Sequence, residues 1–240
     1  MISQQLKVDQ DHLRTARAWL VHAYTATGLI ATFFAVRALL DGRPQAVFVF
    51  LGAALFIDAT DGPFARRWDV KRWTPDFSGR KLDDIVDYIN YTLIPVIFAY
   101  HFGLVEGAWV AALPLVLIAS AYGFCRETAK TDDGYFTGFP SYWNLLVFYL
   151  YLWGGPSWLN AGVLTLFAVL VWIPIKYVTW KTEVLQKTTL ITSLAWGVAL
   201  LMLLVRFKEA SSLLIWTSLL YPLYHFGLSF YLHFSGRSSS

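Results

Sequence analysis

The chain has 240 residues, of which 57% are hydrophobic, 18% aromatic and only 15% charged. Soluble domains average about 25% charged residues, so this composition excludes an ordinary soluble protein and indicates an all-α, polytopic integral membrane protein. The net charge of +3 indicates no nucleic-acid partner, because cytoplasmic loops of membrane proteins collect Lys and Arg in any case.

The N-terminal residues 1–17 are polar and charged, with a few apolar residues among them. This pattern predicts either a short interfacial helix lying on the membrane surface or a solvated lead-in. The apolar run that follows is too long for the core of a signal peptide, so we expect no cleavage there. At the other end, residues 235–240 predict a disordered tail.

Eight segments after this lead-in are apolar enough to predict membrane-spanning helices, which need about 20 residues each. Their ranges are 18–40, 45–67, 79–102, 107–129, 140–154, 158–178, 188–206 and 211–233. The fifth is short, and the orientation of everything after it would invert if it did not cross.

The distribution of basic residues supports about eight spans with both termini in the cytoplasm. With the N-terminus inside, fifteen of the nineteen Lys and Arg residues fall in cytoplasmic segments. The four on the outside are Arg37, Arg43, Arg206 and Lys208. Because no repeat or linker is visible, we expect a single transmembrane domain over residues 1–240.

One polar stretch, residues 58–87, concentrates acidic residues where the second and third predicted spans meet. Asp58 and Asp61 are three residues apart, and Asp83 and Asp87 are four apart, so on helices each pair shares a face. Packed together, these faces would gather four carboxylates around one point, as hard cations such as Mg²⁺ or Mn²⁺ prefer. The alternative is that these acids cap helices or pair with nearby arginines.

The same stretch resembles the signature of the CDP-alcohol phosphotransferases, Asp-x-x-Asp-Gly-x-x-Ala-Arg followed by Gly-x-x-x-Asp-x-x-x-Asp. Every fixed position is filled, by Asp58, Asp61, Gly62, Ala65, Arg66, Gly79, Asp83 and Asp87. The spacer, residues 67–78, is longer than in most of the family. In this it is similar to the bacterial branch that joins CDP-diacylglycerol to choline, the phosphatidylcholine synthases.

The resemblance implies metal-dependent transfer of a phosphatidyl group from CDP-diacylglycerol to choline, giving phosphatidylcholine and CMP. It implies an enzyme of the bacterial inner membrane whose active site lies at the cytoplasmic face, among membrane lipids, and it suggests a homodimer. Asp58, Asp61 and Asp83 are the implied ligands of two Mg²⁺ or Mn²⁺ ions. Asp87 is the implied general base and a further ligand. The residues implied to contact CDP-diacylglycerol are Gly62, Ala65, Arg66 and Gly79.

Several of these residues also allow a plainer interpretation. Gly62 and Ala65 are small, which in membrane proteins more often indicates close helix packing. Pro63 follows Gly62, and the residue before a proline avoids helical geometry, so a kink or break in the helix is expected there. Arg66 could bind a pyrophosphate as a fork-shaped donor or serve as a cytoplasmic anchor.

Choline carries a quaternary ammonium, and such cations are held by aromatic faces. The candidates near the cytoplasmic side are Tyr88 and Tyr91, just after Asp87, and Tyr142 and Trp143, in an aromatic segment further along. The alternative for each is membership of the aromatic belt at the membrane interface.

Two other functions compete with choline transfer. The first is the same reaction with another acceptor: serine, glycerol 3-phosphate or an inositol compound. A phosphorylated acceptor should require basic residues, and residues 131–145 contain none. The second is a cation transporter, which should spread its acids through the bilayer and show internal repeats. Here the acids cluster at one face.

Overall fold

The computed structural model describes residues 2–129, 131, 134–179 and 186–235, and the chain divides into two compact units, Met1–Ile94 and Pro95–Ser240. The described residues form helices joined by short turns, with two strands of two residues each, which confirms the all-α prediction. Of the predicted disordered tail, residues 236–240 lie outside the described part. Whether residues 1–240 form a single domain stays a prediction.

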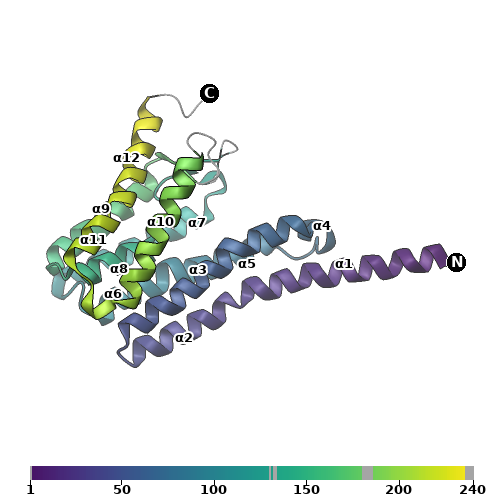
Figure 1. Cartoon of the computed structure of the whole chain (residues 1–240), viewed down its shortest axis with the longest axis horizontal. Coiled ribbons are helices and arrows are strands. Elements are labelled where there is room, and N and C mark those ends of the chain that lie inside the picture. The colour runs from purple at the N-terminus through teal and green to yellow at the C-terminus, as the bar shows by residue number, and fades with distance from the viewer. Residues whose placement is uncertain (1, 130, 132–133, 180–185, 236–240) are drawn as a thin grey trace. The chain divides into compact units, whose positions relative to one another are not determined.

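The first unit contains the whole acidic stretch. Its elements are α1 (Ile2–Ala26), α2 (Gly28–Leu40), α3 (Pro44–Arg67), α4 (Val70–Trp73), α5 (Gly79–Asp87) and the π-helix η1 (Tyr88–Leu93). A turn at Thr27 separates α1 from α2, and α3 runs back beside both helices (Figure 1).

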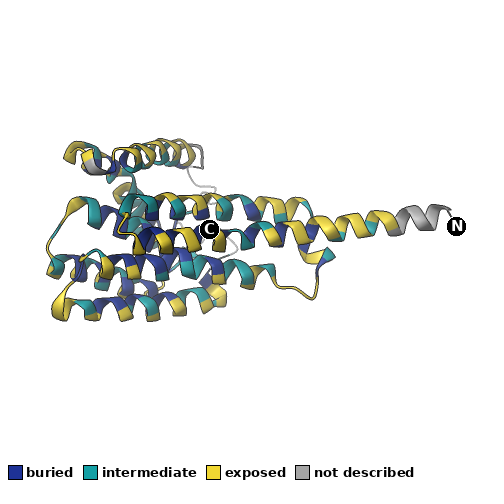
Figure 2. Cartoon of the chain, turned by 90° about the horizontal axis from the view of Figure 1, so that it is seen from below, coloured by how far each residue is buried: buried dark blue, intermediate teal, exposed yellow. Residues whose placement is uncertain are grey.

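Small residues allow α2 and α3 to approach each other closely. Ala35 and Ala38 of α2 are fully buried, and Ala54 of α3 is 5% exposed. Large apolar side chains such as Phe33 and Phe56 point outward and are more than 60% exposed, as the exposed stripes along these helices show (Figure 2). Small residues inside and large apolar residues outside are typical of helices that pack within a lipid bilayer.

Two predictions about this unit change in detail. Residues 2–17 are helical, but they belong to the same helix as the start of the first predicted span, because α1 continues to Ala26. Their location on the membrane surface stays a prediction. Of the kink or break predicted at Pro63, the break is wrong, since α3 continues through Pro63 to Arg67, while a kink stays a prediction.

The helix that carries the second acidic pair changes its winding immediately after that pair. Ser78 caps α5, and its side chain accepts a hydrogen bond from the Lys81 N–H at 3.3 Å. From Tyr88 the winding becomes π-helical, and the N–H of Ile94 bonds to the carbonyl of Ile89, five residues back. Pro95 follows and has no N–H, so it cannot form the ordinary α-helical bond to the Tyr91 carbonyl. Short π-helical segments within helices are frequently found at functional sites.

The second unit consists of helices and one small strand pair. Its helices are α6, which begins at the boundary between the units (Ile94–His101), α7 (Ala112–Cys125), α8 (Trp143–Trp153), α9 (Ser157–Trp172), α10 (Gln186–Val205), α11 (Ser212–Ser218) and α12 (Leu220–Phe234), with the 3-10 turns η2 (Gly107–Ala111), η3 (Glu127–Ala129) and η4 (Phe207–Glu209). Strands β1 (Phe136–Thr137) and β2 (Lys176–Tyr177) pair antiparallel.

Five helical segments in the described part of the chain are long and apolar enough to cross a membrane. They are Asp9–Leu40, Pro44–Arg67, Gly107–Cys125, Thr188–Val205 and Ser212–Phe234. Helices α8 and α9 are apolar but shorter, and the predicted third span begins with the charged turns of α5. The chain is therefore an integral membrane protein with several spans, while the count of eight stays a prediction.

Candidate active site

Three of the four predicted acidic residues meet in the first unit. Asp58 comes from α3, and Asp83 and Asp87 come from successive turns of α5. One carboxylate oxygen of each lies within 4.8 Å of the other two, and all three residues are half-buried. Like charges this close repel one another, so the arrangement favours a bound cation.

The three carboxylates border a small cavity of about 10 Å³. This is about the space needed for one water-sized particle. Its walls come from α1, α3, α5 and η1, and its lining residues are Thr25, Ala54, Ile57, Asp58, Asp61, Asp83, Val86, Asp87, Asn90 and Tyr91. All four predicted acidic residues thus line one cavity.

Asp61 differs from the other three acids in its surroundings. It is 7% exposed, and its Oδ2 accepts a hydrogen bond of 2.7 Å from the hydroxyl of Thr25 in α1. Among the described residues the group of three that could share a metal ion does not include it. Asp61 of α3 therefore lines the cavity where α3 faces α1, apart from the other three carboxylates. The sequence had predicted all four carboxylates around one point.

A tyrosine holds the carboxylate of Asp58. The hydroxyl of Tyr91 in η1 donates a hydrogen bond of 2.7 Å to Asp58 Oδ2, and Tyr91 is 9% exposed. The neighbouring Asn90 is also buried, donates to the carbonyl of Val86 and accepts from the hydroxyl of Thr32 at 2.9 Å. These bonds fix η1 against α2 and α3 on one side of the cavity.

The small residues of the motif have different surroundings. A Cβ atom on Gly79 would lie 2.8 Å from Cε1 of His22, so the helix start at Gly79 fits against α1 only without a side chain. His22 is itself held by a hydrogen bond of 2.9 Å to the Thr74 hydroxyl. Ala65 packs beside the buried cluster of Ala18, Val21 and Val70. Both residues therefore take part in helix packing, whatever else they contact.

Arg66 lies over the remaining small residue. A Cβ atom on Gly62 would be 3.3 Å from a terminal nitrogen of the Arg66 guanidinium, one turn further along α3. Gly62 is half-buried and Arg66 is exposed. The guanidinium is therefore available to a ligand beside the turn that carries Asp58 and Asp61.

Comparison with known proteins identifies the family. No protein-family model matches the chain. A phosphatidylcholine synthase of Legionella pneumophila is 35% identical over 223 residues, which cover 89% of this chain and 88% of that protein. Phosphatidylcholine synthases of Pseudomonas aeruginosa and Borreliella burgdorferi are each 39% identical, over 69% and 72% of this chain and 70% and 75% of their own lengths. The chain belongs to the phosphatidylcholine synthase family. The predicted family and the prediction of an enzyme are thereby confirmed.

The site of this phosphatidylcholine synthase family member fits a divalent metal ion. Three half-buried carboxylates with oxygens within 4.8 Å of one another form the all-oxygen donor set that Mg²⁺ and Mn²⁺ prefer. The cavity between them has room for about one small ion. The identity of the ion and the number of ions stay predictions.

The four aromatic residues predicted to hold choline are divided between the two units. Tyr88 is half-buried at the start of η1, and the hydroxyl of Tyr91 is bonded to Asp58. In the second unit, Tyr142 is 40% exposed, whereas Trp143 is fully buried and its indole N–H donates to the Ser120 hydroxyl at 2.6 Å. A common cage formed by all four rings stays a prediction.

Sequence reasoning missed Thr25, Thr32 and Asn90. Asn90 and Tyr91 follow Asp87 by three and four residues, so the spacing on one helix could have suggested them. Thr25 and Thr32 precede the motif by more than two dozen residues, and no local pattern connects them with it. Asp84, the neighbour of Asp83 on α5, forms an ion pair of 3.9 Å with Arg80 and is not part of the group of three.

Proposed function

We propose that this protein transfers a phosphatidyl group from CDP-diacylglycerol to choline, in a reaction that depends on Mg²⁺ or Mn²⁺. One observation carries the proposal: in a member of the phosphatidylcholine synthase family, Asp58, Asp83 and Asp87 gather their carboxylates beside one cavity. A substrate pyrophosphate is an anion, and three carboxylates can accommodate one only when cations lie between them.

Asp58, Asp83 and Asp87 would hold the metal, with Asp61 at the wall of the same cavity. A divalent ion there supplies positive charge that offsets the developing charge on the phosphate oxygens. The bonds of Thr25 to Asp61 and of Tyr91 to Asp58 fix two carboxylates before any substrate arrives. Such supporting hydrogen bonds orient metal ligands in many enzymes.

The proposed reaction forms one bond and breaks one bond at phosphorus, and it moves one proton. The oxygen of choline bonds to the phosphorus that bears diacylglycerol, and the bond from this phosphorus to the bridging oxygen of the pyrophosphate breaks. CMP leaves with that bonding electron pair. Asp87 accepts the proton of the choline hydroxyl, and Arg66 holds the pyrophosphate through paired N–H donors.

The acyl chains of CDP-diacylglycerol would lie in the bilayer beside the outward-facing apolar side chains of the first unit. The cytoplasmic face of a bacterial inner membrane is the proposed location of the site, supported by the positive-inside distribution of Lys and Arg. Aromatic rings near Asp87, Tyr88 first among them, are the proposed contacts of the choline ammonium. Assembly into a homodimer remains a proposal from the family resemblance.

A headgroup panel tests the proposal directly. The purified full-length protein is supplied with CDP-diacylglycerol and Mg²⁺ and offered choline, serine, inositol, glycerol 3-phosphate or ethanolamine in turn, and CMP release is measured. We expect release with choline well above release with the others. If serine or glycerol 3-phosphate supports faster release, the acceptor is wrong. If no acceptor in the panel supports CMP release from CDP-diacylglycerol, the proposed transfer reaction is wrong.

A further inference from the structure

A second recess in the first unit, separate from the carboxylate cavity, gathers basic residues. It has a volume of about 300 Å³, and four arginines line it, Arg14, Arg17, Arg67 and Arg72, together with Trp68 and Trp73. This volume lies at the lower end of the range for small-molecule sites. We name this recess the arginine pocket.

Three segments bring the arginines together although they are distant in the sequence. Arg14 and Arg17 lie on α1, Arg67 is the last residue of α3, and Arg72 belongs to α4. The ring of Trp73 joins two of these segments, because the guanidinium carbons of Arg14 and Arg72 each lie 5.3 Å from its centroid. Below them Ala18, Val21 and Val70 form a buried cluster against which Trp68 and Trp73 pack. The two tryptophans of the pocket are therefore fixed by packing, while the four arginines around them are exposed and open to a ligand.

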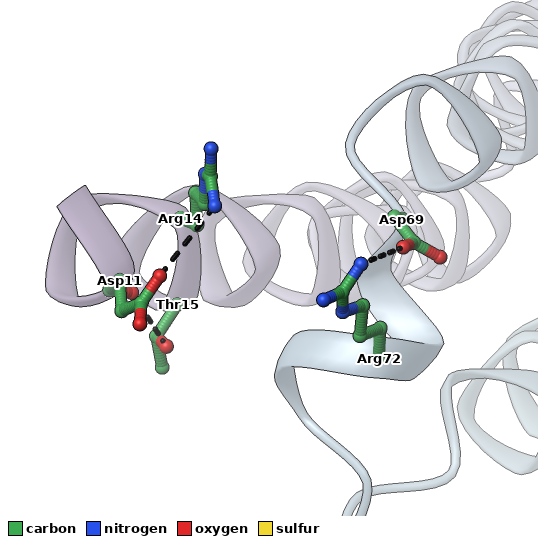
Figure 3. Close-up of polar contacts among 5 residues, drawn as sticks. All are labelled: Asp11, Arg14, Thr15, Asp69 and Arg72. Atoms are coloured by element: carbon green, nitrogen blue, oxygen red, sulfur yellow. Dashed lines mark hydrogen bonds and ion pairs between the residues drawn. The ribbon is translucent and has the colours of Figure 1, made fainter. Parts of the chain in front are cut away.

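The chain's own carboxylates neutralise little of this charge. Among the lining residues the only acid is Asp69. Its ion pair with Arg72 measures 4.0 Å, and that of Asp11 with Arg14 measures 3.5 Å (Figure 3). Both pairs are largely exposed, so solvent screens them and they offset little of the charge of the arginines. In the part of the chain that the structure describes, Arg17 and Arg67 have no ion pair.

The position of the pocket along α1 indicates where it lies relative to the membrane. Trp19 and Leu20, two and three residues after Arg17, are 49% and 64% exposed, as expected of side chains that face lipid. The pocket thus opens where α1 passes from a charged to a lipid-facing surface. Tryptophan rings such as those of Trp68 and Trp73 are enriched at this membrane level.

The arginine pocket is also separate from the proposed reaction centre. Arg67 follows Asp58 by nine residues on α3, which corresponds to about 13 Å along a helix. None of the residues lining the arginine pocket lines the carboxylate cavity. The arginine pocket is therefore a separate recess from the carboxylate cavity, although Arg67 directly follows Arg66, the proposed contact of the pyrophosphate.

We propose that the arginine pocket binds the phosphate of an anionic phospholipid headgroup at the cytoplasmic membrane surface. Guanidinium groups bind phosphate oxygens through paired N–H donors, and four of them converge here on one recess. The recess opens beside lipid-facing side chains, which favours a phosphate attached to a membrane lipid over one in solution.

The test measures lipid binding by the purified full-length protein in a neutral detergent, using native mass spectrometry. The probes are phosphatidylglycerol, phosphatidylcholine and the soluble compound glycerol 3-phosphate. Two variants each remove two charges from the pocket: Arg67→Gln with Arg72→Gln, and Arg14→Gln with Arg17→Gln. The matched control, Lys71→Gln with Arg43→Gln, removes two exposed charges that do not line it.

We expect each pocket variant to bind phosphatidylglycerol about 10- to 30-fold more weakly than the wild type, since each basic residue near a membrane contributes about fivefold. The control should change by less than about twofold. Because two separate pairs are tested, the failure of one variant to fold leaves the other as the test. If a folded pocket variant binds phosphatidylglycerol as tightly as the control, the proposal is overturned.

Two further outcomes decide the kind of ligand. Excess glycerol 3-phosphate should not displace phosphatidylglycerol, and if it does, the occupant is a soluble phosphate and the lipid proposal fails. Phosphatidylcholine, which has no net charge, should bind more weakly than phosphatidylglycerol. Binding should persist in excess EDTA and in Asp58→Asn, so this test is independent of the proposed catalytic function.

Discussion

The hydroxyl of Tyr91 donates a hydrogen bond of 2.7 Å to Oδ2 of Asp58 and so joins the π-helix η1 to α3. The sequence suggested Tyr91 as a ring that contacts choline, whereas its hydroxyl is engaged with a proposed metal ligand. The two roles make different demands on the side chain, because the first needs the ring and the second needs the oxygen.

Tyr91→Phe separates these roles. The variant keeps the aromatic face but leaves Asp58 without this donor, so we expect the Mg²⁺ concentration for half-maximal activity to rise about 10- to 100-fold. The choline KM at saturating Mg²⁺ should stay unchanged. Titration of CMP release against Mg²⁺ and against choline measures both. An unchanged Mg²⁺ requirement would remove Tyr91 from the support of the metal site.

The metal ligands are tested by Asp58→Asn and Asp83→Asn. Each replaces a charged oxygen donor by a neutral amide in a site that must oppose a pyrophosphate, so we expect CMP release to be abolished while the protein stays folded. Excess EDTA should abolish release by the wild type. Asp84→Asn is the matched control on α5, because Asp84 pairs with Arg80 instead of joining the group. Full turnover of the wild type in EDTA would contradict the metal proposal.

Asp87→Asn tests the role of the general base. Base catalysis typically contributes about 10²–10⁴-fold, so turnover should fall within that range while CDP-diacylglycerol binding changes little. Single-turnover rates and a separate nucleotide-binding measurement distinguish the two effects. Equal losses of affinity and turnover would instead make Asp87 mainly a metal ligand.

Gly79→Ala tests whether this motif glycine is required for packing. Its new Cβ would lie 2.8 Å from the His22 ring, and such overpacking typically costs about 1–3 kcal/mol. We expect a lower thermal midpoint without any substrate present. The added change His22→Ala should restore part of the stability. Gly52→Ala, with no atom within 4 Å of the added Cβ, is the control and should not destabilise. A loss confined to CDP-diacylglycerol affinity would assign Gly79 to substrate binding instead.

The choline contacts are tested by Tyr88→Leu and Tyr142→Leu. A cation–π contact is worth about 0.5–2 kcal/mol, so the loss of a contributing ring should raise the choline KM by roughly 2- to 30-fold. The KM for CDP-diacylglycerol should barely change, since neither ring is proposed to contact it. If neither variant alters the dependence on choline, other side chains hold the ammonium.

The site was predictable where its geometry is local. Asp83 and Asp87 share a face because they are four residues apart on one helix, and any helix of this sequence would present them together. The spacing of Asp58 and Asp61 allowed the same inference, yet only Asp58 joins the group of three. The hydrogen bond from Thr25 to Asp61 depends on the packing of α1 against α3, which no local spacing encodes.

The fold was predictable to a similar extent. Apolar composition and segment length predicted a helical membrane protein, because a bilayer requires backbone hydrogen bonds to be satisfied within the span. The winding of η1 was not visible, since it depends on how Asn90 and Tyr91 bond to neighbouring helices. The break expected at Pro63 was wrong, because local backbone preference is a weak predictor within a long helix that tertiary packing supports.

Helix α1 contributes both Arg17, in the arginine pocket, and Thr25, which holds Asp61 beside the carboxylates. The two residues are eight positions apart on one uninterrupted helix, so their levels differ by about 12 Å along its axis. With the proposed headgroup site and the proposed metal site at these two levels, α1 would fix the distance between them. The alcohol acceptor would then have to reach about one helix segment of this length beyond the headgroup phosphates to meet CDP-diacylglycerol.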